Sequence, residues 1–477
     1  MSTDPTTYVY TDICLQTGVC TVDTAPYTWI FVVATIMMIL QAYAVGANDC
    51  SNSFAASVGA RALTLKQAVF LAFFLEFLGA ILAGAATTGT IRKGIADLDP
   101  FTMKPELLLF GMAMVQVCNA AWLFIATFWE LPVSTTHSVV GSIIGMAIAI
   151  NGPNSVNWVK TGDLNAFGGS LTGIVISWVL APVLAGIASG FMFTITRILI
   201  MRQPNSYERA AYAFPFYALV AVFIAVFAIV YRGLPAAQKQ IDSLPGGLDE
   251  NKVPLGAVWI AAVIAFGAAV FAGTVGNYFV RRAVDNEMQS EAQKKSEIDN
   301  RIPHLSDKAS NAIVTKVHLV EVCDFFEDEG TVIKNPDDIE VKYPDKFPAF
   351  MGGGRVPILL QSNPVYQFVS YGLNYDIHEC IDSDSSVNAT HDQCEIFDYR
   401  TELYYRFLQV FVSCFNMFAH GSNDVANSIA PFAASYLVWT TGTVAKNSPT
   451  PTWILAVGGL SMSCGLMTLG YKVIHKV

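Results

Sequence analysis

The sequence predicts an all-α membrane protein with an inverted-topology repeat and about nine apolar segments, some of them candidate re-entrant half-helices. Composition is the first observation behind this prediction. Of the 477 residues, 53% are hydrophobic and only 14% are charged, whereas a soluble globular chain is about one quarter charged. A repeated polar motif is the second observation. GANDCSNS at 46–53 recurs as GSNDVANS at 421–428, and both copies lie at the end of a long apolar stretch.

The apolar segments fall into two groups along the chain. About 20 apolar residues in a helix span a bilayer, and runs approaching or exceeding that length occur at 28–46, 68–90, 107–129, 137–151, 170–196, 213–231, 255–280, 403–435 and 453–471. The run 137–151 is short, which favours a re-entrant half-helix, and a break is also expected within 403–435. We expect an extracellular tail at 1–27, the first repeat and the following helices at 28–282, a loop at 283–402, and the incomplete start of the second repeat at 403–477.

Lysine and arginine residues predict the orientation, because they accumulate in short cytosolic loops. The first 26 residues contain neither, so the tail is placed outside. Alternate crossings then put Arg61, Arg202, Arg281 and Lys472 in the cytosol. The short basic loop around Arg92 is an exception, because the same count places it outside. An odd number of crossings separates the two motif-bearing segments, which therefore run in opposite directions. An inverted repeat of this kind builds a binding site at the bilayer midplane with access from both sides.

The segment 283–402 is predicted to be a cytosolic loop that is partly disordered. It holds a polar, helix-prone run followed by a stretch rich in Pro, Asp and Gly, and such sequences bury too little apolar surface to fold. A glycosylation sequon at Asn388, flanked by Cys380 and Cys394, favours the opposite side of the membrane. In the outer tail, Cys14 and Cys20 form either a disulfide or two free thiols.

The repeated motif supplies candidate cation ligands. A lone carboxylate in a low dielectric is forced to take up a proton unless a cation binds it, and Na⁺ prefers oxygen ligands. The predicted Na⁺ ligands are Asp49, Asn52, Asp424, Asn427 and Glu76, the last lying in the middle of an apolar segment. Hydrogen bonding between helices at a Gly- and Ala-rich interface is the alternative for one copy, but two inverted copies favour binding.

A second polar run, LPVSTTH at 131–137, predicts an anion site. Proline is favoured in the first turn of a helix and Ser or Thr at its cap, so a helix begins here at membrane depth. Its free N–H groups and three hydroxyls suit a tetrahedral oxyanion, although an ordinary capped helix start is the alternative. The predicted anion ligands are Asn48, Ser53, Gln116, Ser134, Thr135, Thr136, Asn423 and Ser428.

Two histidines and the absence of catalytic motifs complete the sequence-based prediction. His137 is more often an interface histidine than a proton carrier, and His420 is equally compatible with lining the site and with packing. Nothing in the sequence resembles a nucleotide-binding P-loop, a Ser/His/Asp set or a dinucleotide fingerprint. An enzyme is therefore not expected, and no cofactor is expected beyond Na⁺ as a coupling ion.

The motifs GANDCSNS, GSNDVANS and LPVSTTH resemble those of the inorganic phosphate transporter (PiT) family, which includes sodium-dependent phosphate symporters. The resemblance covers about 28–280 and 403–472 and implies symport of phosphate with Na⁺, or with H⁺ in some members, by alternating access. It implies a multi-pass protein, with the plasma membrane as the expected location. The expected partners are inorganic phosphate, Na⁺ or H⁺ and the lipid bilayer, with a homodimer as one arrangement and no nucleic acid.

The resemblance also concerns the end of the chain. In the family the second repeat continues past the stretch matching GYKVIHKV, and a second PVSTTH-like motif follows. The resemblance therefore implies that the second repeat is only partly encoded before Val477.

Two rival functions stay open at this level. The first is H⁺-coupled phosphate transport in which Glu76, Asp49 or His137 titrates. The second is a membrane receptor or scaffold that binds phosphate without moving it and signals through 283–402.

Overall fold

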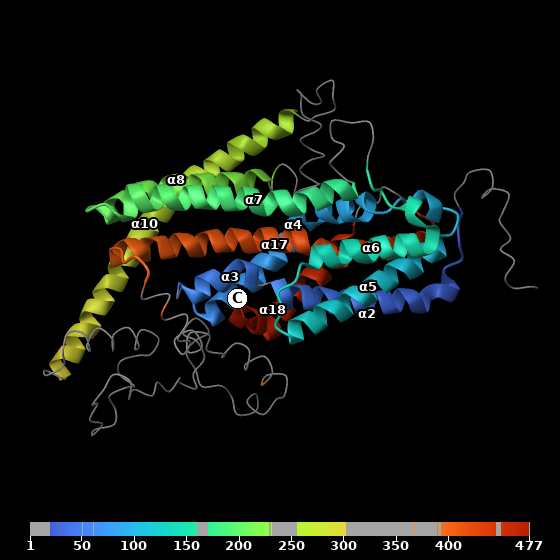
Figure 1. Cartoon of the computed structure of the whole chain (residues 1–477), viewed down its shortest axis with the longest axis horizontal. Coiled ribbons are helices and arrows are strands. Elements are labelled where there is room, and N and C mark those ends of the chain that lie inside the picture. Colours follow the sequence, from blue (N-terminus) through green and yellow to red (C-terminus); the bar gives the residue numbers. More distant parts are fainter. Residues whose placement is uncertain are drawn as a thin grey trace, which may run out of the picture.

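The computed structural model describes residues 20–49, 51–60, 62–159, 170–228, 230, 255–301, 367, 389, 393–444 and 450–476. The described part is built from helices (Figure 1). They are α2 (Thr28–Asp49), α3 (Ser51–Gly59), α4 (Leu65–Gly94), α5 (Pro105–Phe128), α6 (Thr135–Asn151), α7 (Leu171–Thr196), α8 (Ser206–Ala228), α10 (Leu255–Arg301), α17 (Tyr399–Thr441) and α18 (Thr452–Lys476), with the short turns η1 (Ala25–Tyr27), η2 (Asp99–Phe101), η3 (Pro153–Ser155) and η4 (Arg197–Met201).

Seven of the described segments are helical, long and apolar enough to cross a membrane. They fall in α2 to α5, α7, α8, α10 and α18, which confirms the predicted all-α membrane fold. The helix predicted at 137–151 is α6, whose 17 residues fall short of the about 20 that a full span needs. The predicted short helix therefore exists, and its first turn lies in the interior of the bundle.

The break expected within 403–435 is wrong, because α17 runs continuously from Tyr399 to Thr441 and carries the second motif in its middle. Pro431 lies inside this helix and has no N–H to donate to the carbonyl of Asn427 one turn earlier. Gln41 of α2 replaces that donor, since its Nε2 donates to the Asn427 carbonyl at 3.0 Å. A neighbouring helix thus repairs the ladder that the proline interrupts.

The two motif-bearing helices run in opposite directions along the long axis of the molecule (Figure 1). Each packs against a helix of the other repeat: α2 contacts α18, and α17 contacts α4. A Cβ at Gly46 would overlap the backbone carbonyl of Met462 in α18, and a Cβ at Gly421 would overlap that of Glu76 in α4. Glycine thus permits close helix contact at the same position of both motifs.

A second pair of contacts follows the same correspondence between the repeats. Gln41 precedes the first motif, and Asn416 occupies the matching position before the second. Gln41 donates to the carbonyl of Asn427, as described above, and Asn416 Nδ2 lies 3.5 Å from the carbonyl of Asn52, the residue that matches Asn427. These matched contacts support the predicted inverted repeat.

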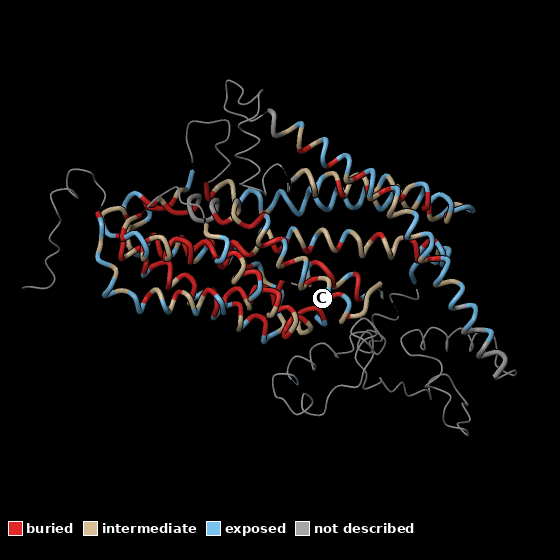
Figure 2. Tube along the Cα trace, turned by 180° about the vertical axis from the view of Figure 1, so that it is seen from behind, coloured by how far each residue is buried: buried red, intermediate tan, exposed pale blue. Residues whose placement is uncertain are grey.

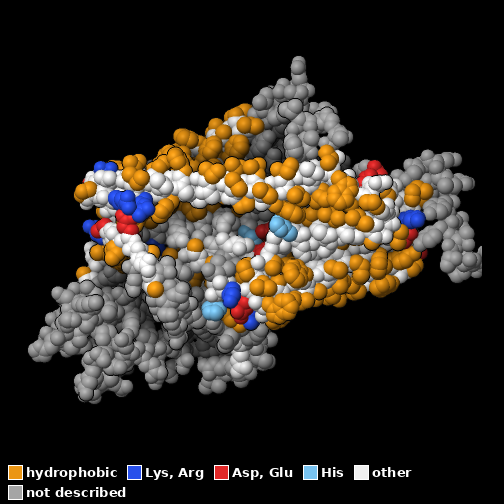
Figure 3. All heavy atoms as spheres, in the orientation of Figure 1, with side chains coloured by type: hydrophobic (Ala, Val, Ile, Leu, Met, Phe, Trp, Pro, Cys, Tyr) orange, Lys and Arg blue, Asp and Glu red, His pale blue; other side chains and the backbone are white. Residues whose placement is uncertain are grey.

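Buried residues are concentrated where α2, α4, α5, α6, α17 and α18 meet (Figure 2). By contrast, α7 is exposed over most of its length, with Val179 67% and Ile187 65% accessible. Apolar side chains cover the outer helices in broad bands (Figure 3). Exposed aliphatic helix faces of this kind suit the hydrocarbon of a bilayer.

Both ends of the predicted loop 283–402 are described. At its start, α10 continues as a polar helix to Arg301, and Arg400 and Arg406 of α17 pair with Asp285 and Glu287 of α10. The predictions for the sequon at Asn388 and for Cys380 lie outside the described residues, as does Cys14. Cys20 is disulfide-bonded.

Candidate functional site

The connection between α5 and α6 brings a helix start into the interior. Glu130 has a left-handed backbone with φ 60°, and the amides of Glu130 and Leu131 donate to the carbonyls of Thr127 and Ala126. This is a Schellman ending of α5 in which Glu stands where glycine is usual. Ser134 then caps α6, and its Oγ accepts from the backbone N–H of His137 at 3.2 Å.

Asn48 of the first motif holds this connection. Its Nδ2 donates to the Thr127 hydroxyl at 3.2 Å and to the Leu131 carbonyl at 2.9 Å. Its Oδ1 accepts from the backbone N–H of Val133 at 3.0 Å. Asn48 is buried, with only 1% of the residue exposed. These three bonds fix the point at which α6 begins.

The hydroxyls of α6 link the two motif copies. Thr135 donates to Asp49 Oδ2 at 2.9 Å and accepts from Asn427 Nδ2 at 2.8 Å. The Thr136 hydroxyl lies 3.5 Å from Asp424 Oδ1 and 3.4 Å from Asn427 Oδ1. Asn427 Nδ2 also donates to Asp424 Oδ1 at 2.9 Å. One helix start therefore contacts an Asp from each repeat.

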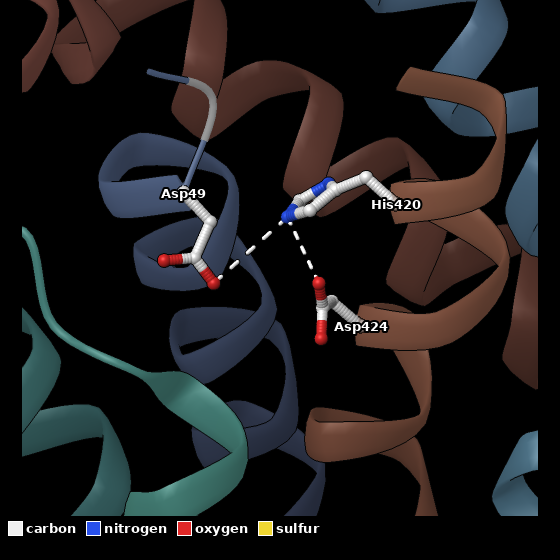
Figure 4. Close-up of side chains that lie close together, drawn as sticks. All are labelled: Asp49, His420 and Asp424. Carbon is white, nitrogen blue, oxygen red and sulfur yellow. Dashed lines mark ion pairs between the residues drawn. The ribbon is translucent and has the colours of Figure 1, made fainter. Parts of the chain in front are cut away.

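His420 lies between the two aspartates (Figure 4). Its Nε2 is 3.1 Å from Asp424 Oδ2 and 3.9 Å from Asp49 Oδ2. On the other side of the ring, Nδ1 is 2.9 Å from Oε1 of Glu76, a residue of α4 that is fully buried. Three helices, α2, α4 and α17, thus contribute to one cluster of ionisable groups.

The charges of this cluster do not balance within it. Three carboxylates, those of Asp49, Glu76 and Asp424, surround one imidazole. A buried carboxylate without a compensating charge costs several kcal/mol. The cluster therefore favours binding of cations or protons. Acidic and histidine side-chain atoms are visible in a recess of the surface in Figure 3.

Several predicted ligands lie away from the carboxylates. Gln116 is buried and donates to the carbonyl of Ser428 at 3.3 Å, and the Ser428 hydroxyl is buried. Ser53 accepts from Asn416 at 3.2 Å. Asn52 and Asn423 are exposed. The described hydrogen bonds and ion pairs therefore join Asp49, Asp424, Asn427, Thr135, Thr136 and Glu76, and the other ligands stay predictions.

Sequence reasoning left His420 open between lining the site and packing, and it did not consider Thr127. His420 precedes the second motif directly, and Val45 occupies the matching position in the first copy, so the repeat gives no signal for it. The pairing of His420 with Glu76 joins residues far apart in the chain and is visible only in three dimensions.

A buried and a partly buried carboxylate from two antiparallel helices, set among helices of membrane length, are typical of an integral membrane protein of the transporter class. Residues 45–477 match the family described as the phosphate transporter family, and the chain belongs to that family. This family consists of transporters and is not a class of enzymes.

Individual relatives agree with the family. The chain is similar to the phosphate-repressible phosphate permease pho-4 of Neurospora crassa, with 25% identity over 94% of this chain and 83% of the relative. It is 26% identical to sodium-dependent phosphate transporter 1 of Rattus norvegicus over 94% of this chain and 83% of the relative. The Homo sapiens protein of the same name is 27% identical over 94% of this chain and 84% of the relative.

A solved structure named the sodium-dependent phosphate transporter has the same fold. It aligns with a TM-score of 0.59 and 25% sequence identity, and the alignment covers 94% of this chain and 77% of the other. The helical arrangement is therefore that of a known phosphate transporter.

Proposed function

We propose that this chain carries inorganic phosphate across a membrane by symport with Na⁺. The observation that carries the proposal is the meeting of Asp49 and Asp424, one from each motif copy, around a hydroxyl-bearing helix start. The names of the relatives and of the solved structure support phosphate and Na⁺ as cargo. The plasma membrane is the proposed location.

In this proposal Asp49 and Asp424 bind Na⁺, with the Asn427 and Thr136 oxygens as neutral ligands. Both neutral side chains lie within 3.5 Å of Asp424 Oδ1. Glu76 acts through His420, because its carboxylate contacts the imidazole rather than the aspartates.

Phosphate is proposed to bind at the start of α6, where Ser134, Thr135 and Thr136 offer hydroxyls. Inorganic phosphate carries one to two negative charges at neutral pH, and burying it without compensation costs many kcal/mol. Na⁺ held by the two aspartates offsets both the carboxylates and the anion. Ion and substrate then need each other, which is the physical origin of coupling.

The predicted anion ligands Asn48 and Gln116 receive a different role. Asn48 bonds to three groups of the α5–α6 connection, and Gln116 bonds to the Ser428 carbonyl. We assign the side chains of Asn48 and Gln116 to positioning, whereas the buried Ser428 hydroxyl stays a predicted anion ligand. Asn52, Ser53 and Asn423 stay predicted ligands on the strength of the repeat alone, because no described contact ties their side chains to the carboxylate cluster.

The motion is proposed to be alternating access by the two inverted repeats. The packing of α2 on α18 and of α17 on α4, in which the motif helix of each repeat contacts a helix of the other repeat, supports this proposal. A homodimer and a cytosolic position of 283–402 are parts of the proposal that follow from the family resemblance and the charge pattern.

Labelled phosphate uptake into proteoliposomes tests the proposed function. We expect accumulation above equilibrium with an inward Na⁺ gradient, and none with equal Na⁺ on both sides. Accumulation driven by a pH gradient in Na⁺-free buffer would show that H⁺, and not Na⁺, is the coupling ion. Phosphate binding without accumulation under either gradient would overturn transport in favour of a receptor.

A further inference from the structure

The ring nitrogen of His420 that faces the aspartates has no hydrogen-bond partner. Nε2 approaches Asp424 Oδ2 at 3.1 Å but not in the direction that a hydrogen bond requires. The residue is only 9% exposed, so bulk water does not solvate the nitrogen. Figure 4 shows Nε2 aimed between the carboxylates of Asp49 and Asp424.

In the neutral imidazole of His420, the contact with Glu76 determines which ring nitrogen carries the proton. Nδ1 lies 2.9 Å from Glu76 Oε1, so a proton on Nδ1 donates to that carboxylate. The Nε2 lone pair then points at the aspartates. A histidine that donates its other N–H to a carboxylate is the usual arrangement of metal-ligating imidazoles, because the carboxylate fixes the ring and raises its basicity.

Na⁺ does not account for this nitrogen. Hard cations take oxygen ligands, whereas imidazole with carboxylates suits borderline divalent ions such as Zn²⁺. One ligand atom each from Asp49, His420 and Asp424 lies within 4.8 Å of the others. Tetrahedral Zn²⁺ with bonds of about 2.1 Å places its ligands about 3.4 Å apart, and the distances of 3.1 and 3.9 Å from Nε2 to the two aspartates bracket that value.

We propose that Asp49, His420 and Asp424 form a binding site for a divalent transition cation of the Zn²⁺ type, with Glu76 orienting the imidazole. The two negative charges of Asp49 and Asp424 equal the charge of one divalent cation. When that cation is bound, it neutralises both carboxylates, and no negative charge is left to attract Na⁺. Zn²⁺ and Na⁺ therefore exclude each other at this site. The exclusion, though not the metal site itself, rests on the proposed function.

Binding of Zn²⁺ alone to the full chain in lipid nanodiscs tests the proposal. In Na⁺-free choline buffer we expect one labelled Zn²⁺ per chain, and Na⁺ in place of choline should weaken its binding. His420→Ala should lower the affinity by at least about tenfold, and Glu76→Gln should lower it by about 10- to 100-fold, as loss of an outer carboxylate does elsewhere. Co²⁺ in place of Zn²⁺ gives an absorption spectrum that reports the nitrogen ligand and should change in His420→Ala.

His137→Ala is the matched control, because His137 lies on α6 against the ring of Trp178 and is exposed. It should bind Zn²⁺ as the unaltered chain does. His420→Asn guards against misfolding of the alanine variant and should also lose the metal. Unchanged Zn²⁺ affinity in both His420 variants, or an equal loss in His137→Ala, would overturn the site, and indifference to Na⁺ would overturn the exclusion.

Phosphate uptake in proteoliposomes separates this proposal from the transport function. If Zn²⁺ binds as expected but no gradient drives phosphate uptake, the metal site stands and the proposed function fails. If uptake is driven by Na⁺ but Zn²⁺ binding does not depend on His420, the reverse holds.

Discussion

At the scale of single residues, Asn48 sets the geometry of the helix start that faces the two aspartates. Its amide joins the hydroxyl of Thr127, the carbonyl of Leu131 and the N–H of Val133, and these partners belong to a connection that is already strained. Glu130 has a left-handed backbone, a conformation that costs a residue with a side chain about 1–2 kcal/mol. The Asn48 bonds and the ion pair of Glu130 with Lys472, 3.6 Å apart, hold the connection against that strain.

Removing the Asn48 amide should loosen the connection. Asn48→Ala leaves the Val133 N–H and the Leu131 carbonyl without this partner. Both bonds are partly buried, so the loss of one costs about 0.5–1.5 kcal/mol. Hydrogen exchange at the Val133 amide should therefore become about two- to tenfold faster, as measured by mass spectrometry on peptides spanning 131–137. Asn423→Ala, at an exposed position, should leave this exchange unchanged. Unchanged exchange in Asn48→Ala together with an altered phosphate or Na⁺ dependence would make Asn48 a ligand.

Glu395 provides a pH-dependent contact outside the membrane-spanning segments. Hydrogen bonds from Arg202 at 2.7 Å and from Arg197 at 2.8 Å lower the pKa of Glu395 from 4.5 to about 2. The folded carboxylate therefore binds a proton less readily than the unfolded one. The contact stabilises the fold above pH 4.5, and that contribution is lost as the pH falls toward 2.

A spin label at position 396 should report this contact, because Ile396 is 93% exposed and adjacent to Glu395. The label should be restrained at pH 6 and gain mobility as the pH falls below about 4.5. In Glu395→Gln it should be mobile at every pH. A restrained label in that variant at pH 6 would show that the arginine contacts do not hold the segment.

Sequence reasoning identified the residues of the site better than their roles. Asp49, Asp424, Asn427, Thr135 and Thr136 were predicted as ligands and lie together. Polar groups in apolar surroundings are visible in a sequence because their burial has a high cost. The partner of each group is not visible, and so Asn48 was assigned to phosphate although its bonds go to the protein.

At the scale of helices, the close contacts of the motif glycines hold the two repeats together. A methyl group at Gly46 or Gly421 would meet a backbone carbonyl, which no side-chain rotation can move. Gly46→Ala and Gly421→Ala should each cost about 1–3 kcal/mol and lower the melting temperature in detergent by a few degrees. Gly141→Ala on α6 is the control, because a Cβ there has no atom within 4 Å, and its melting temperature should not fall. Equal melting temperatures for all three variants would contradict the close packing.

The helix pattern also shows where sequence-based prediction of elements fails. Among the described residues, hydrophobic runs predicted each helix that is long and apolar enough to span a membrane, because the length of a span follows from the thickness of the bilayer. The continuity of α17 could not be predicted, since a proline normally interrupts a helix. The donor that restores the ladder, Gln41, comes from another helix.

At the scale of the whole molecule, the sequence analysis predicted opposite directions for α2 and α17, and the structure has them so (Figure 1). The crossing count behind that prediction included 137–151, although α6 has only 17 residues, so the count alone does not explain the antiparallel arrangement. The meeting of the two motifs is a property of the packing. The short helix α6 brings them together by contacting an Asp of each. The central claim of the transport mechanism is that these two aspartates bind the coupling ion jointly.

Na⁺-driven phosphate uptake by Asp49→Asn and Asp424→Asn, each compared with the unaltered chain in proteoliposomes, tests that claim most directly. Each variant should reach the membrane in normal amount. Its Na⁺-driven phosphate accumulation should fall more than about tenfold, which is equivalent to at least about 1.4 kcal/mol of coupling free energy. Asp99→Asn, at an exposed position, should keep it. Normal accumulation with an unaltered Na⁺ dependence in either site variant would contradict the claim that both aspartates hold the ion.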